Sequence, residues 1–152
     1  MKNKVFNIYI SILLFLVLLT ANITTAFAAS ETYISPTCEQ DTPLWYLAHL
    51  ICGEAQNCDD LEQQYVASVV INRVNSSLFP NSIYEVIFQP GQYACTWDGN
   101  YYREPTINNY RNAQHILDYG SILPGNVLYQ AAGVQGDGEY MRTSYHVYSY
   151  QN

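Results

Sequence analysis

The chain has 152 residues, with 13 acidic side chains against six Lys and Arg and a formal net charge of −7 at pH 7. A chain of this length is enough for one compact domain. Binding of nucleic acid or of anionic lipid depends on clustered Lys and Arg, so the charge balance argues against both classes of partner.

Residues 1–28 have the organisation of a secretory signal peptide. Lys2 and Lys4 provide a positive start, Ile8 to Leu19 is an apolar run, and Ala26-Phe27-Ala28 is a small-x-small cleavage site. An uncleaved signal anchor is the alternative, although the apolar run is short for a membrane span of about 20 residues. We expect cleavage, and a location that is secreted or in the cell envelope.

Four cysteines follow this segment, at Cys38, Cys52, Cys58 and Cys95. An exported chain with an even number of cysteines suggests disulfides, and four cysteines allow three pairings. We favour Cys52–Cys58 together with Cys38–Cys95. The spacings do not match paired Cys-x-x-Cys zinc ligands, so we expect no metal and no other cofactor.

Helix start and stop signals divide the rest of the chain. A polar arm is expected over 29–40 and a single domain over 41–152, with no second domain. N-cap residues and capping boxes predict helices over 43–55, 59–75, 82–88 and 106–119. In two of these boxes the acid three residues after the cap is Glu62 or Glu85, and we expect both to act as capping partners.

The remaining segments are predicted to be loops and short extended pieces. Residues 91–105 are expected to form a loop or short hairpin, with Asp98-Gly99 as the turn signal. Val127 to Tyr129 and Tyr145 to Tyr148 are short apolar-aromatic runs, separated by a glycine-rich segment. We expect them to form one wall of a cleft, in a mainly α domain of the α+β class.

Glu54 is the first candidate for chemistry. It lies at the end of the first predicted helix, and no Lys or Arg occurs within ten residues of it on either side. Burial disfavours the charged form of a carboxyl group, and a carboxylic acid that stays protonated near neutral pH can protonate a leaving sugar oxygen. A carboxylate that merely solvates the helix end is the alternative.

Several motifs in order resemble the cell wall hydrolases of the spore cortex-lytic enzyme type. They are Gly53-Glu54-Ala55, Val69-Val70-Ile71-Asn72-Arg73-Val74, Phe79 to Ile87, Gln89 to Tyr93, Asp98-Gly99, Leu128-Tyr129 and His146-Val147-Tyr148. Tyr93 stands where Phe is usual, and Ala94 stands where Ser or Thr is common. Cys58 replaces a second acid that many relatives carry four residues after the catalytic Glu.

The resemblance implies a lysozyme-like single domain with Glu54 as the catalytic residue on the cleft wall. It also implies cleavage of peptidoglycan between N-acetylmuramic acid and N-acetylglucosamine, in many members as lytic transglycosylases that need one Glu. A hydrolysing muramidase, with a second carboxylate among Asp59, Asp60 and Asp98, is an alternative. So is a non-catalytic peptidoglycan-binding protein.

Substrate contacts are predicted from aromatic and polar residues near these motifs. Aromatic faces stack on sugar rings, and amides or hydroxyls bond sugar substituents. The predicted contacts are Gln92, Tyr93, Thr96, Trp97, Tyr129, Gln130 and His146. Arg73 is expected either to fix its helix against the cleft loops or to bind a muramoyl peptide carboxylate. The substrate is expected to be cell wall or spore cortex peptidoglycan, acted on by a monomer, with the groove or a protein partner providing targeting.

Overall fold

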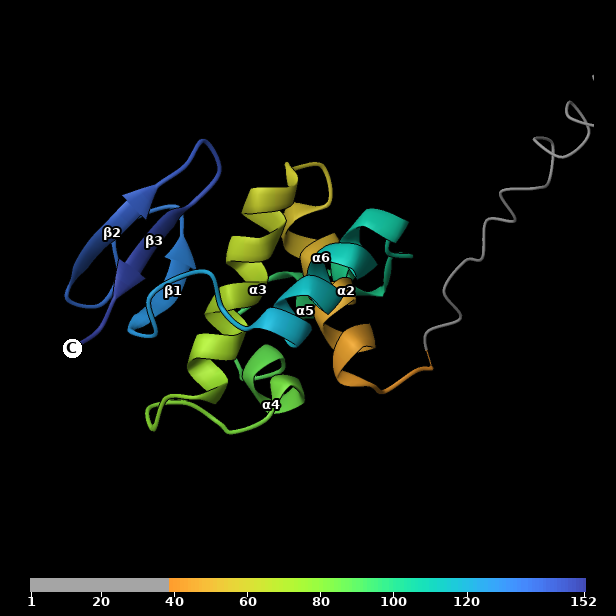
Figure 1. The fold of residues 1–152 in the computed structure, drawn as a ribbon, viewed down its shortest axis with the longest axis horizontal. Coiled ribbons are helices and arrows are strands. Elements are labelled where there is room, and N and C mark those ends of the chain that lie inside the picture. The colour runs from red at the N-terminus through yellow and green to blue at the C-terminus, as the bar shows by residue number, and fades with distance from the viewer. Residues whose placement is uncertain (1–38) are drawn as a thin grey trace, which may run out of the picture. The chain divides into compact units, whose positions relative to one another are not determined.

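The computed structural model describes residues 39–152, and Figure 1 shows its elements. The expected signal peptide, most of the arm and Cys38 lie outside the described residues. The elements are α2 (Pro43–Ala55), α3 (Asp60–Val74), α4 (Ile83–Ile87), α5 (Cys95–Asp98), a 3-10 turn (Asn100–Tyr102), α6 (Ile107–Tyr119), β1 (Val127–Ala131), β2 (Gly138–Arg142) and β3 (Val147–Tyr150). The prediction of a mainly α domain with a few short strands is confirmed.

Local capping explains where the long helices begin. Thr42 accepts a hydrogen bond from the backbone N–H of Trp45 at the start of α2, and Asp59 accepts one from Glu62 at the start of α3. Thr106 and Asn109 form a reciprocal capping box at the start of α6, which ends before Gly120 at a φ of +85°. These bonds satisfy N–H groups that have no partner inside the helix. The predicted bounds of all three helices are confirmed within one residue.

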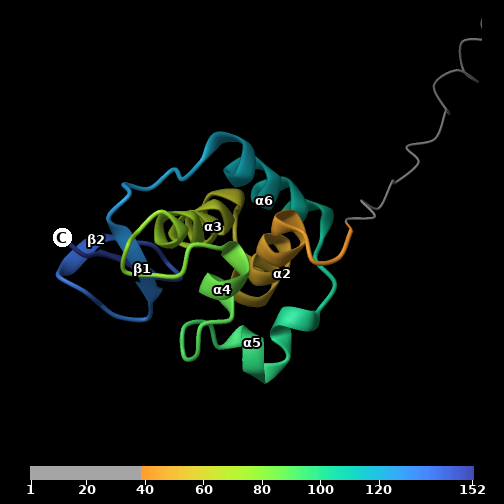
Figure 2. The same cartoon turned by 90° about the horizontal axis from the view of Figure 1, so that it is seen from below.

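Helices α2, α3 and α6 lie side by side (Figure 2), and their buried side chains form most of the main core. The apolar residues of α2 predicted to face inward follow a spacing of three and four, and Leu47, Ala48 and Ile51 are fully buried. On α3, Val66, Val69 and Val70 are fully buried in the same way. Burial of these apolar side chains provides the main stabilisation of the helical layer.

The small sheet lies against α3, with strand order β1-β3-β2 and antiparallel pairing throughout. Two side chains near the end of α3 attach it to β1. Asn72 Nδ2 donates to the carbonyl oxygens of Pro124 (2.8 Å) and Val127 (3.0 Å). Arg73 Nε donates to the carbonyl oxygen of Leu128 at 2.6 Å. The structural role considered for Arg73 is therefore present.

Residues 91–105 are loop and turn except for two short helices, α5 and the 3-10 turn, so the expected hairpin is wrong and the expected loop is right only in part. Thr96 Oγ1 donates to the carbonyl oxygen of Tyr93 at 2.8 Å, and the chain winds into α5. Gly99, at a φ of +90°, ends α5 and leads into the 3-10 turn. This segment has no alternation of apolar and polar residues, which a hairpin would need.

The favoured Cys52–Cys58 disulfide is also wrong. Cys52, Cys58 and Cys95 are all free thiols in the structure. The Cys52 sulfur lies 3.6 Å from the carbonyl oxygen of Glu104, so its thiol faces the segment before α6. Cys58 lies after the end of α2, next to the cap of α3.

Candidate active site

Glu54 lies in the last turn of α2 and is half-buried. Its Oε1 accepts a hydrogen bond from the backbone N–H of Cys95, at the start of α5, at 3.4 Å. The neighbouring Gly53 allows this approach, because a Cβ on Gly53 would lie 2.7 Å from Cys95 Cβ and 2.8 Å from its sulfur. Close packing of α5 on α2 therefore helps to hold the carboxyl group of Glu54 in place.

A hollow of about 310 Å³ opens beside Glu54. It is lined by residues 53–58, which form the end of α2 and the link to α3, and by Arg103 and Tyr145. Tyr145 belongs to the connection between β2 and β3 and is exposed. The hollow therefore has one wall from the helices and another from the segment before β3. Of the two apolar-aromatic runs expected to form a cleft wall, only Tyr145 lines this hollow, and residues 127–129 do not.

Arg103 places a positive charge in this hollow, which the local sequence around Glu54 did not indicate. Its guanidinium donates to the carbonyl oxygen of Cys52 and, through Nε, to that of Asn100. Arg103 is 49 residues from Glu54 in the chain, so its position depends on the packing of the 3-10 turn against α2. The absence of nearby Lys and Arg in sequence did not mean an absence of positive charge in space.

The other carboxylates considered for catalysis make local structural bonds. Asp59 caps α3. Asp98 accepts from the backbone N–H of Asn100 at 2.8 Å and from its side-chain amide at 2.9 Å. Asp60 accepts from the amides of Asn108 and Asn112 on α6, and these bonds hold its pKa below the usual value. None of these three side chains lines the hollow at Glu54.

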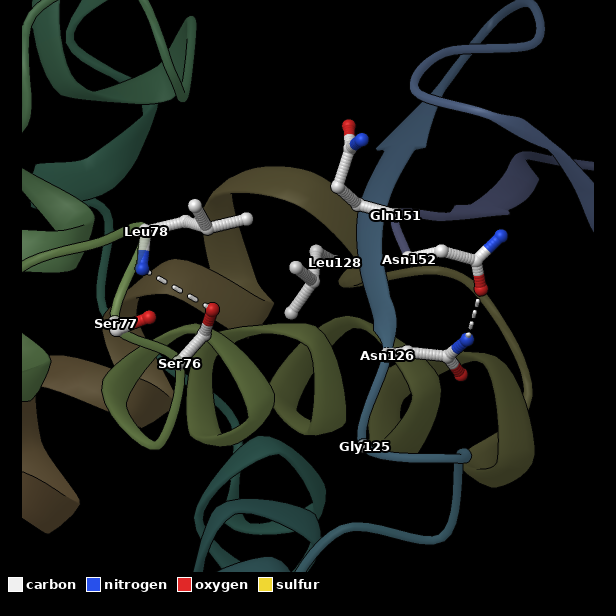
Figure 3. Close-up of a pocket in the computed structure, with 8 residues that line it drawn as sticks. All are labelled: Ser76, Ser77, Leu78, Gly125, Asn126, Leu128, Gln151 and Asn152. Atoms are coloured by element: carbon white, nitrogen blue, oxygen red, sulfur yellow. Dashed lines mark hydrogen bonds between the residues drawn. The ribbon is translucent and has the colours of Figure 1, made fainter.

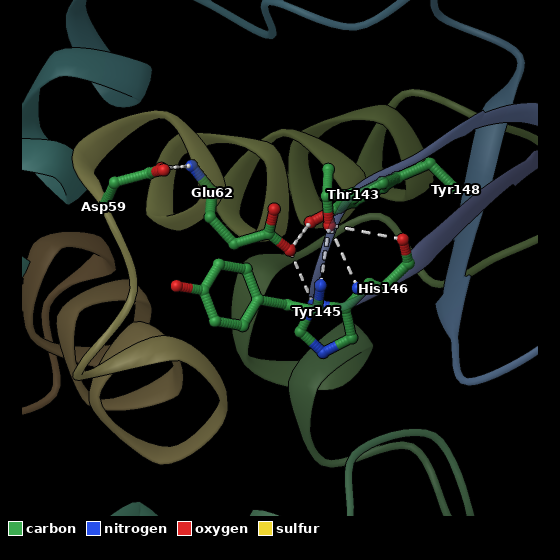
Figure 4. A network of polar contacts seen from close by, with 6 residues as sticks. All are labelled: Asp59, Glu62, Thr143, Tyr145, His146 and Tyr148. Atoms are coloured by element: carbon green, nitrogen blue, oxygen red, sulfur yellow. Dashed lines mark hydrogen bonds and ion pairs between the residues drawn. The ribbon is translucent and has the colours of Figure 1, made fainter.

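The role expected of Glu62, as a capping partner, is wrong. Its backbone N–H bonds to Asp59, but its side chain turns inward and is 2% exposed. There Oε1 lies 2.6 Å from His146 Nδ1 and accepts from the Tyr148 hydroxyl at 2.8 Å (Figure 4). Burial, and then this bond to Glu62, raise the pKa of Tyr148.

A sequence signal for the inward position of Glu62 did exist. Glu62 is four residues before Val66 and seven before Val69, which places all three on one face of α3. Val66 and Val69 were predicted to be core residues, so the same spacing assigns Glu62 to the core side. The capping-box interpretation of Glu62 did not take this spacing into account.

The predicted substrate contacts fall into different environments. Trp97 is 61% exposed, Gln92 is exposed, and the Thr96 hydroxyl donates to the carbonyl oxygen of Tyr93, just before α5. The Tyr129 hydroxyl donates to the Gln151 side chain at 3.3 Å, and the buried amide atoms of Gln130 have no hydrogen-bond partner in the described part of the chain. These five residues do not line the hollow at Glu54.

Tyr93 is 2% exposed, so its ring belongs to the core. Arg73 lies over the rings of Tyr93 (5.2 Å), Tyr129 (5.8 Å) and Phe79 (4.8 Å). Burial raises the pKa of the Tyr93 hydroxyl, the positive charge of Arg73 lowers it, and the negative charge of Glu54 raises it. The Tyr93 hydroxyl is therefore neutral and within electrostatic range of both Arg73 and Glu54.

A second hollow, of about 450 Å³, lies at the other end of α3 (Figure 3). It is lined by Ser76, Ser77, Leu78, Gly125, Asn126, Leu128, Gln151 and Asn152. None of the predicted catalytic or substrate-binding residues is among them. No ionisable side chain lines this second hollow.

Two further findings concern residues 39–152 alone. Within this range no three His, Cys, Asp or Glu side chains come together in an arrangement that could hold a metal ion. In the same range no helix has both the length and the apolar character needed to cross a membrane.

Comparison with curated proteins finds spore cortex-lytic enzymes. The protein of that name from Oceanobacillus iheyensis is 36% identical over 85 residues, covering 55% of this chain and 30% of that protein. The one from Bacillus subtilis strain 168 is 42% identical over 59 residues, covering 39% of this chain and 19% of that protein. The chain thus spans less than a third of the length of these relatives.

Two solved structures share the fold. The catalytic domain of the germination-specific lytic transglycosylase SleB from Bacillus anthracis matches with a TM-score of 0.62, at 22% identity over 74% of this chain and 98% of that chain. The catalytic domain of the Bacillus cereus SleB protein also matches with a TM-score of 0.62, at 24% identity, over 79% and 98%. The predicted lysozyme-like α+β fold is confirmed.

A family model described as cell wall hydrolase matches residues 59–151, which is more than half of the chain. Glu54 lies just before the matched range, and Glu62, Tyr145 and His146 lie inside it. The chain belongs to the cell wall hydrolase family.

Proposed function

We propose that the chain cleaves the glycan strands of peptidoglycan between N-acetylmuramic acid and N-acetylglucosamine, as a lytic transglycosylase with Glu54 as its one catalytic acid and base. The observation that carries the proposal is the hollow at Glu54, whose lining among the described residues includes no second carboxylate. Membership of the cell wall hydrolase family supports the substrate class. The name of the Bacillus anthracis protein, a lytic transglycosylase, supports the reaction type.

One carboxyl group is sufficient for this reaction. Glu54 donates its proton to the glycosidic oxygen as the bond from that oxygen to C1 of the muramoyl residue breaks. The C6 hydroxyl of the same residue then forms a bond to C1, and its proton passes to the Glu54 carboxylate. The attacking hydroxyl is part of the substrate, so it has the high effective concentration of a tethered group. The product ends in a 1,6-anhydro ring, and Glu54 regains its proton.

Hydrolysis would place a different demand on the site. Glycosidases that add water generally use a second carboxylate as base or nucleophile. Asp59 and Asp98 are both held by local hydrogen bonds, as a helix cap and as a turn residue. This arrangement supports the one-acid reaction over the hydrolysing muramidase.

The substrate in the proposal is cell wall or spore cortex peptidoglycan, reached by secretion into the cell envelope. The curated relatives are named spore cortex-lytic enzymes, and one structural match is described as germination-specific. The exposed Trp97 and Tyr145 provide aromatic faces of the kind that stack on sugars.

Release of soluble fragments from purified peptidoglycan tests the proposal. Glu54→Gln keeps the shape of the side chain but cannot transfer the proton, so the rate should fall by about 100-fold or more. Glu85→Gln is the matched control: Glu85 lies on α4, is exposed, and bonds to Ser82. It should keep the wild-type rate. A Glu54→Gln protein with the wild-type melting temperature and substantial activity would contradict the proposal.

A further inference from the structure

Glu62 is a buried carboxylate whose side-chain hydrogen-bond partners among the described residues come from the segment around β3. It is 2% exposed, and its Oε1 meets both His146 Nδ1 and the Tyr148 hydroxyl. Among residues 39–152 no Lys or Arg forms an ion pair with it, and the His146 ring is the basic group in contact with it. Removal of a carboxylate from water is costly, so both donors are needed to stabilise it there.

The contact with Glu62 determines which nitrogen of the His146 ring is occupied and which is left free. A distance of 2.6 Å between Nδ1 and the carboxylate oxygen requires a proton between them. With an ionised Glu62 that proton is on Nδ1, because a bare nitrogen lone pair would face a negative oxygen. Nε2 is then left as the free ring nitrogen, and it points away from Glu62 in Figure 4. The side chain of His146 is 18% exposed, so the ring is partly open to solvent.

The turn that carries His146 is held in one conformation. Thr143 Oγ1 accepts hydrogen bonds from the backbone N–H groups of Tyr145 (3.1 Å) and His146 (3.0 Å). The backbone N–H of Thr143 donates to the carbonyl oxygen of His146 at 2.9 Å. The turn therefore fixes the backbone that carries Tyr145 and His146, and of these two residues Tyr145 lines the hollow at Glu54.

The same turn borders the hollow at Glu54. Tyr145, the residue directly before His146, lines that hollow together with Glu54 and Cys58. Burial raises the pKa of the Cys58 thiol, and the negative charge of Glu62 raises it further. The buried carboxylate is thus within electrostatic range of the wall of the hollow.

We propose that Glu62 and His146 form a dyad that serves the Glu54 site. His146 contacts the glycan strand through Nε2, with a hydroxyl or N-acetyl group as its partner, and Glu62 is the positioning residue that sets the ring. The inference rests on the proposed function for its substrate class. It assigns Glu62 a role in substrate binding that neither its helix position nor its burial requires.

Asparagine and glutamine at position 146 separate this role from a purely structural one. Asn can place its amide near the position of Nδ1 and keep the bond to Glu62, but it has no group at the position of Nε2. Gln reaches further and can place an amide there. His146→Asn should raise KM roughly tenfold, the effect of one lost hydrogen bond in a partly buried site, and His146→Gln should raise it less. A His146→Asn protein with the wild-type KM would overturn the dyad.

Glu62→Gln tests the positioning residue, with Glu85→Gln as the matched control on α4. The amide keeps the volume but removes the charge that orients the ring, so KM should again rise roughly tenfold. Glu85→Gln should keep the wild-type KM. An unchanged KM in folded Glu62→Gln protein would overturn the role of Glu62.

Binding in the Glu54→Gln background keeps this test separate from the test of cleavage. Soluble peptidoglycan fragments should bind this protein, shift the nitrogen resonance of His146 Nε2 in an NMR spectrum, and bind about tenfold more weakly when His146→Asn is added. If the fragments bind in this way while the wild type releases no product from peptidoglycan, the cleavage proposal fails and the dyad is supported. If the fragments leave the Nε2 resonance unchanged, the dyad is overturned, whether or not the wild type cleaves peptidoglycan.

Discussion

The groups that surround Glu54 in the folded structure are more polar than its neighbours along the chain. Its chain neighbours are apolar or small, but Arg103 lines the same hollow and the Cys95 backbone N–H bonds its Oε1. Burial, and then the bond to Glu54 and its negative charge, raise the pKa of the Cys95 thiol. Cys95 is therefore a neutral neighbour of Glu54 that meets it through both its backbone N–H and its thiol.

Gly53→Ala tests whether the packing of α5 sets the position of Glu54. The added methyl group would overlap Cys95, so α5 must move away from α2. Displacement of a catalytic group by about 1 Å can cost up to roughly 100-fold in rate, and we expect a loss of about tenfold or more in kcat/KM. Gly133→Ala is the control, because a Cβ there meets no atom within 4 Å. Equal activity of both variants in the fragment-release assay would show that this packing is not needed.

At the scale of elements, α3 joins the two parts of the site. Its first turn provides Glu62, which reaches β3, and its last turns provide Asn72 and Arg73, which reach β1. Its N-terminal end also meets α6 through Asp60. One helix thus holds the sheet, and with it Tyr145 and His146, against the helical layer that carries Glu54.

The bond between α3 and α6 predicts a small acid-sensitive contribution to stability. Hydrogen bonds from Asn112 and Asn108 hold the pKa of Asp60 below its ordinary value of 3.8. The stabilisation is therefore fully present above that value and is lost as the pH falls through the lower pKa of the folded state. Because the carboxylate is exposed, Asp60→Asn should lower the melting temperature at pH 6 by only a few degrees.

The comparison of acid unfolding curves checks this prediction. Between about pH 4 and pH 2 the wild type should lose stability faster than Asp60→Asn, since the variant has no carboxylate to protonate. Parallel curves for the two proteins over this range would contradict the assigned role of Asp60.

The helices were predictable because their caps depend on residues close in sequence. The site was predictable only in part. Caps at Thr42, Asp59 and Thr106 depend on neighbouring residues, so the long helices had the right bounds. Strand β2 was not separated from the glycine-rich loop around it, because it is mostly exposed and lacks an apolar face. The contributions of Arg103 and Tyr145 to the hollow depend on tertiary packing, which local patterns do not encode.

At the scale of the whole molecule, the hollow at Glu54 exists only in the folded chain. Its two walls come from residues 53–58 and from the turn before β3, with Arg103 from the segment between them. The match to the cell wall hydrolase model covers residues 59–151, which include Arg103 and the turn before β3, while residues 53–58 lie just before it. The central claim is that this assembled site works with one carboxylic acid.

Mass spectrometry of the fragments released from purified peptidoglycan tests that claim most directly. The account predicts fragments that end in 1,6-anhydromuramic acid, produced by the wild type and absent with Glu54→Gln. Fragments that end in reducing muramic acid, each heavier by one water, would contradict it, because water would then be the nucleophile and a second base would be required.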